Sequence, residues 1–76
     1  MKNKYIQVHP NETKINDSCT IEILRADDKD GYDMLIFDEE ENAIIQEWEP
    51  DFEWAWLTAK YYSLKHNLEI FDRTPY

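Results

Sequence analysis

The sequence has little of what nucleic-acid and phosphate sites use. It contains one glycine, Gly31, so the glycine-rich phosphate loops, which need at least two glycines at a set spacing, are excluded. It has 8 Lys and Arg residues against 17 Asp and Glu, which gives a net charge of −9. Because phosphate contacts need clusters of basic residues, we expect no direct binding to nucleic acid or to an anionic membrane.

Cysteine and long apolar runs are also scarce. Cys19 is the only cysteine, which excludes an intramolecular disulfide, and its strand-like surroundings predict a small buried side chain. No apolar run approaches the roughly 20 residues of a membrane span, and no stretch resembles a secretory signal. We therefore expect a cytoplasmic protein without a membrane partner.

What the chain does have is enough apolar surface for one small domain. Its 76 residues are 42% hydrophobic and 14% aromatic, which is too rich for a disordered segment. A domain of this size buries only roughly 60% of the surface that its unfolded chain exposes, so its stability margin is small. We expect a single acidic domain spanning residues 1–76.

The apolar pattern predicts an α+β fold. Residues 19–26, 32–37 and 43–48 alternate as strands do, and turn-rich segments at 27–31 and 38–42 separate them. Residues 5–8 are a further candidate strand, while residues 68–71 form either a last short strand or an apolar clip, before a fraying end at 72–76. A helix is expected from an Asp51 N-cap to about His66, with Asn67 in the left-handed position that ends it. The expected fold is an antiparallel meander of three or four strands with this C-terminal helix packed on it.

The helix has two apolar stripes instead of one. At 100° per residue, the two stripes are separated by polar residues on both sides, and one small sheet can cover only one of them. The uncovered stripe requires cover from the N-terminal segment and residues 68–71, from a second copy of the chain, or from another protein. Trp54, Trp56 and Tyr61 are the candidate contact residues. The first stripe is Phe52, Ala55, Trp56, Ala59 and Tyr62. The second stripe is Trp54, Leu57, Tyr61, Leu64 and Leu68.

The negative charge is concentrated in the middle of the chain. Residues 22–53 hold 13 acids and 2 bases, a net charge of −11. The run Asp38, Glu39, Glu40 and Glu41 occupies a predicted turn, and Glu47 and Glu49 share one face of the following strand. These six carboxylates are the candidate partner-binding charges, and a basic protein is the natural complement.

Conventional chemical sites are poorly supported. The segment Asp27 to Gly31 lacks the first and last carboxylates of a calcium loop, and a hairpin turn explains it better. His66 and Glu69 have the spacing of a metal pair but no converging ligands. A chain of this length can hardly spare the walls of a substrate pocket. We therefore expect no catalytic, cofactor or metal-binding residues.

These observations favour a non-enzymatic protein-binding module. In charge and size alone, such a small acidic fold resembles the DNA mimics that phages encode against host restriction or CRISPR systems. That resemblance implies an inhibitor that occupies the nucleic-acid site of a basic protein. The alternative is a homodimer, or a subunit of a larger complex, whose acidity only keeps it soluble. A continuous band of carboxylates would favour mimicry, and scattered carboxylates would favour the alternative.

Overall fold

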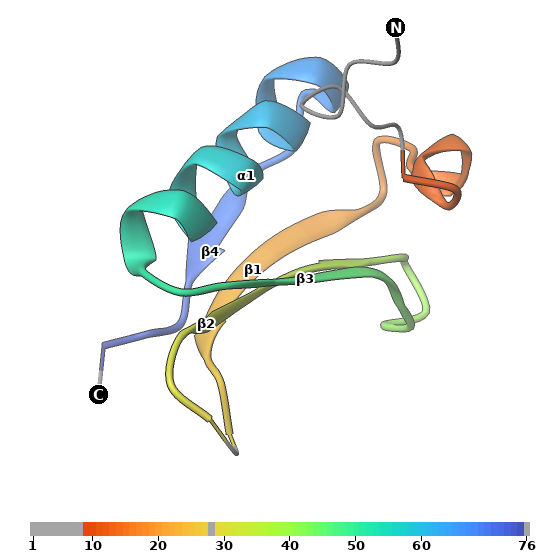
Figure 1. Ribbon diagram of the computed structural model, residues 1–76. Coiled ribbons are helices and arrows are strands. Elements are labelled where there is room, and N and C mark those ends of the chain that lie inside the picture. The colour runs from red at the N-terminus through yellow and green to blue at the C-terminus, as the bar shows by residue number, and fades with distance from the viewer. Residues whose placement is uncertain (1–8, 28, 76) are drawn as a thin grey trace, which may run out of the picture.

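The chain forms a single sheet covered on one face by a helix. A computed structural model describes residues 9–27 and 29–75. Its elements are η1 (Glu12–Lys14, a short 3₁₀ helix), β1 (Thr20–Arg25), β2 (Tyr32–Phe37), β3 (Ala43–Glu49), α1 (Phe52–His66) and β4 (Ile70–Asp72). The four strands lie in the order β3-β2-β1-β4, and α1 runs across one face of the sheet (Figure 1). The predicted α+β fold is confirmed.

The meander of β1, β2 and β3 is antiparallel, as predicted, but the fourth strand is not. β4 pairs with β1 in parallel, with Ile21 opposite Ile70, so the sheet is mixed. The physical reason is the helix: α1 carries the chain back over the sheet, so the segment after it starts at the same end as β1. Parallel neighbours require such a crossover, whereas antiparallel ones need only a tight turn. The candidate strand at residues 5–8 lies outside the described residues.

The capping residues predicted for the two ends of α1, Asp51 and Asn67, cap the helix as expected. The Asp51 side chain accepts a hydrogen bond from the Trp54 amide, 3.1 Å away, which satisfies one of the free N–H groups of the first turn. Asn67 adopts φ 58° and ψ 52°, the left-handed conformation that ends many helices. Ser63 and Leu68 close this end, because the Leu68 amide donates to the Ser63 carbonyl at 3.0 Å.

The core lies between α1 and the sheet. Register pairs Ile21 with Ile36 and Ile23 with Met34, so these four side chains share the helix-facing side. All four are fully buried, and Ala55, Ala59 and Tyr62 of α1 pack over them. The stripe that includes Phe52 and Trp56 therefore faces the sheet. The small alanines let the helix approach closely.

The C-terminal segment is held more firmly than its sequence suggests. The Arg73 amide donates to the Ile23 carbonyl at 2.8 Å, and Arg25 Nε donates to the Thr74 carbonyl at 3.1 Å. Thr74 is buried, and its hydroxyl donates to Asp72. The expected fraying from residue 72 is therefore wrong, because β1 supplies partners for this segment that only the folded sheet brings near.

Candidate protein-binding surfaces

The face of the sheet opposite α1 has no layer over it among the described residues. Alternation along the strands places on this face the residues whose neighbours point into the core. Leu24, Leu35, Phe37 and Phe71 are only partly buried, and Trp48 is 42% exposed. The acids on the same face are Glu22, which pairs with Leu35 and Phe71, and Asp33, which pairs with Leu24 and Trp48. We call this the open face; it combines apolar rings with negative charge.

The turn between β2 and β3 stands at one end of the open face. Asp38 organises it, because one of its oxygens accepts hydrogen bonds from the amides of Glu40 (2.9 Å) and Asn42 (2.8 Å). The hydrogen bond from the Asn42 amide is the largest influence on the pKa of Asp38, which lies below its usual value. Glu41 has φ 66°, a conformation that glycine adopts far more readily. Asp38 is thus structural, while Glu39, Glu40 and Glu41 project their charges.

A shallow hollow joins this turn to the open face. Among residues 9–27 and 29–75, its lining includes the acids Glu22, Asp38, Glu39 and Glu41 and the aromatic residue Phe37, and no lysine or arginine. Ser18 and Thr20 complete the lining. Glu22 has a distant ion pair with Arg73, at 3.7 Å. The hollow is therefore an acidic concavity with an aromatic wall.

Glu47 and Glu49 lie elsewhere. They are on the side of β3 that faces α1, and both are half-buried. The Thr58 hydroxyl of α1 lies 3.3 Å from a Glu49 oxygen. Burial, together with the charges of Glu47 and Glu12, raises the pKa of Tyr62 to about 12. Because β3 is an edge strand, these inward-facing carboxylates also hinder pairing with another strand.

The described carboxylates therefore form neither one band nor an even scatter. One group lines the open face and its end turn, and another lies beside α1. The structure brings Glu22 to the predicted Asp38–Glu41 run, a neighbour that sequence spacing alone did not reveal, and it does not bring Glu47 and Glu49 to that run.

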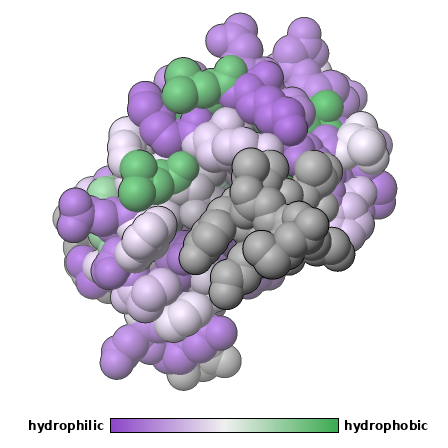
Figure 2. Space-filling view, turned by 45° about the horizontal axis from the view of Figure 1, so that its top comes forward, coloured by the Kyte–Doolittle hydropathy of each residue, from purple (hydrophilic) through white to green (hydrophobic). Residues whose placement is uncertain are grey.

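The outward side of α1 carries a second exposed surface. Trp54 is 57%, Leu57 55%, Tyr61 44% and Leu64 76% exposed. We call these four residues the helix ridge. Leu68, expected in the same stripe, lies beyond the helix end and is buried. Figure 2 views the molecule with the helix side turned forward and shows green apolar groups separated by purple hydrophilic ones.

Trp56, the third aromatic contact candidate, does not belong to the ridge. Its ring stacks on that of Phe52 at a centroid distance of 6.2 Å, and 37% of the residue is exposed. Lys60 Nζ lies 5.8 Å from the same ring. Trp56 therefore contacts Phe52, a partly buried residue that packs against the core.

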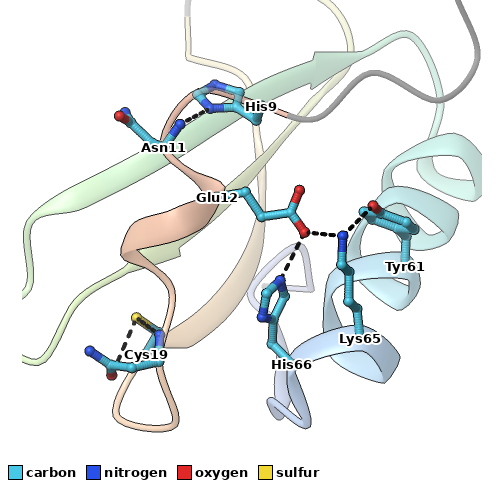
Figure 3. Close-up of polar contacts among 8 residues, drawn as sticks. His9, Asn11, Glu12, Cys19, Tyr61, Lys65 and His66 are labelled. Atoms are coloured by element: carbon cyan, nitrogen blue, oxygen red, sulfur yellow. Dashed lines mark hydrogen bonds and ion pairs between the residues drawn. The ribbon is translucent and has the colours of Figure 1, made fainter.

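An ionic cluster around one buried carboxylate, which the sequence did not reveal, connects η1 to the end of α1. Glu12 is only 5% exposed, and one of its oxygens lies 2.9 Å from both Lys65 Nζ and His66 Nε2 (Figure 3). Lys65 also donates to the Tyr61 hydroxyl at 3.2 Å. Burial by itself raises the pKa of Glu12, but the hydrogen bonds and charges of Lys65 and His66 outweigh it, so the pKa lies below its usual value.

Among residues 9–27 and 29–75, no group of three or more His, Cys, Asp or Glu side chains is placed to hold a metal ion. No helix in this part of the chain combines the length and apolarity needed to cross a membrane. Comparison of the chain with known protein families, with curated proteins and with solved structures finds no match.

Proposed function

We propose that this chain is a non-enzymatic protein-binding module that engages a basic partner through its acidic hollow. The observation that carries the proposal is the lining of the hollow, which in the described part of the chain has four acidic residues and one aromatic residue and no lysine or arginine. A lysine or arginine side chain of a partner fits this chemistry, because its charge meets the carboxylates while its methylenes pack on Phe37.

The conformation of Glu41 supports the proposal. A non-glycine residue in the left-handed region costs about 1–2 kcal/mol, and the chain has Glu at this position, with φ 66°. The negative charge of Glu41 is therefore located at a position whose backbone conformation favours glycine. Such an energetically unfavourable choice is common at functional sites.

In its narrower form, the proposal is that the partner binds nucleic acid and that this chain competes for the site. Concentrated surface carboxylates steer a basic protein much as phosphates do, and steering mainly changes the association rate. Clustered charges still act together at about 0.15 M salt, where the Debye length is roughly 8 Å.

The test compares wild type with a hollow variant, Glu39→Gln with Glu41→Gln, which keeps Asp38 to preserve the turn. Partners are captured from the source cell, identified by mass spectrometry, and their association rates measured between about 0.05 and 0.5 M salt. We expect a basic partner, a rate that falls as salt rises, and at least a roughly tenfold slower association for the hollow variant. A DNA or RNA oligonucleotide bound to the partner then tests competition.

The matched control is Glu53→Gln with Glu69→Gln, which removes the same charge at two exposed positions away from the hollow. It should associate nearly as fast as wild type. A salt-independent rate, or equal rates for the hollow variant and wild type, would remove the acidic hollow as the binding surface. Binding without displacement of the oligonucleotide would remove only the mimicry.

A further inference from the structure

The helix ridge has the spacing of a helix-pairing seam. Trp54, Leu57, Tyr61 and Leu64 follow each other at intervals of three, four and three residues. This is the a-d-a-d pattern by which two helices interlock side chains along a shared stripe. The ridge points away from the sheet, since Ala55, Ala59 and Tyr62 occupy the buried side of α1. Packing among the residues that the structure describes therefore does not account for the spacing.

The charges beside the ridge distinguish the two possible orientations of a helix partner. The start of α1 is acidic, with Asp51 and Glu53, and its end is basic, with Lys65 and His66 in the last turn. A parallel copy would bring like ends together and would set Lys60 against Lys65 of the other helix. An antiparallel copy brings each acidic end to a basic end and opposes the two helix dipoles favourably.

We propose that the helix ridge binds a second copy of this chain, with the two α1 helices antiparallel about a two-fold axis that passes on the ridge side of α1, level with residue 59 along the helix. In this register, Trp54 packs against Leu64 of the second copy and Leu57 against its Tyr61, so each layer pairs one aromatic with one leucine. Asp51 approaches Lys65 of the second copy on one border of the seam. Such an interface is isologous and closed, so it yields dimers and not filaments.

One like-charge approach accompanies this arrangement. The two Lys60 side chains lie near the axis on the other border. Each is already drawn toward Trp56 of its own helix, with Nζ 5.8 Å from the ring. Lys60 is exposed and the border is open to water, so solvent screens most of the repulsion.

The expected dimer is weak and leaves the acidic hollow free. A helix of 15 residues is about 22 Å long, and four side chains per copy reach only the low end of interface sizes, near 600 Å² per partner. We therefore expect a dissociation constant of the dimer in the micromolar range. Because α1 and the open face lie on opposite sides of the sheet, the dimer presents two acidic hollows on its two outer sides.

The oligomeric state is measured by sedimentation equilibrium of wild-type protein from about 1 μM to 1 mM. We expect a monomer–dimer equilibrium that Leu57→Lys with Leu64→Lys weakens at least tenfold, with an unchanged circular dichroism spectrum. The control is Leu35→Lys on the open face, which should dimerise as wild type does. A wild-type monomer at 1 mM, or equal dimerisation of the ridge variant, would overturn the proposal and leave the ridge to a different protein.

Cysteine cross-linking tests the orientation in a Cys19→Ala background. Antiparallel pairing places residue 64 about 15 Å from its counterpart, so Leu64→Cys alone should not form a disulfide. An equal mixture of Leu64→Cys and Trp54→Cys chains should form the mixed disulfide. Efficient self-linkage of Leu64→Cys would show parallel helices and overturn the antiparallel assignment. The hollow variant should dimerise normally, so this result is independent of the proposed function.

Discussion

At the scale of single residues, Glu12 is a buried carboxylate whose stability depends on two cationic partners. One of its oxygens receives both Lys65 and His66, and the other has no hydrogen-bond partner in the described structure. A buried carboxylate in this position is stabilised only while its cationic partners remain in place. It thereby fixes the segment that precedes β1 against the end of α1.

Glu12→Gln should lower the free energy of unfolding by about 1–2 kcal/mol at pH 7, since a charged hydrogen bond is lost but Lys65 is partly exposed to water. The folded pKa of Glu12 is lowered, so its contribution is present above the unfolded pKa and disappears as the pH falls through the folded pKa. Urea titrations at pH 7 and near pH 3 should therefore show a gap between wild type and variant that closes in acid. A gap that widens in acid, or a Glu40→Gln control with an equal effect, would contradict this role.

At the scale of elements, the two hairpins of the meander are closed by different means. The β1–β2 hairpin depends on Gly31, whose φ is 108° and whose α-carbon faces the Trp48 ring. A β-carbon there would lie 2.5 Å from Trp48 Nε1 and 2.6 Å from the Glu49 carbonyl oxygen. The β2–β3 hairpin instead depends on the hydrogen bonds of Asp38 and tolerates Glu41 at φ 66°.

Opposite substitutions in these hairpins should have opposite effects. Gly31→Ala should destabilise the fold by roughly 2–3 kcal/mol, because both the backbone and the Trp48 contact must shift. Glu41→Gly should be neutral or stabilising by up to about 1 kcal/mol, because glycine adopts the same backbone without strain. Thermal and urea unfolding of the two variants measure the difference. A Gly31→Ala protein as stable as wild type would show that the β1–β2 hairpin does not depend on glycine at this position.

At the scale of the whole molecule, repulsion among carboxylates is a general cost. The net charge is −9, and ion pairs link Glu12 with Lys65 and His66 and link Glu22 with Arg73. Unpaired like charges destabilise a compact state, and salt screens them. We expect the melting temperature to rise by several degrees between about 0.01 and 0.5 M NaCl, as measured by circular dichroism. A melting temperature that falls with salt would mean that attraction within ion pairs outweighs the repulsion.

Much of the fold could be predicted because its signals are local. The alternation in residues 32–37 corresponds to β2 residue for residue, and the Asp51 and Asn67 caps bound α1 as expected. The parallel pairing of β4 could not be predicted, because three residues of apolar sequence specify no neighbour and no direction. The candidate site divides in the same way: exposed charge on the Asp38–Glu41 turn follows from its composition, whereas Glu22 joins it only through cross-strand register.

The sequence by itself determined the charge, the two stripes of the helix and the order of the elements, since each depends on residue type and short spacing. Only the tertiary structure decided which stripe is buried. Both stripes are apolar, and the alanines at 55 and 59 settle the choice because they alone allow α1 to approach the sheet closely. The tertiary structure also decided that Glu12 lies against Lys65 and His66, more than fifty residues away. It placed Glu47 and Glu49 on the edge strand β3, beside α1, and not in the acidic hollow. These are consequences of packing, which brings distant residues together and leaves no trace in local sequence.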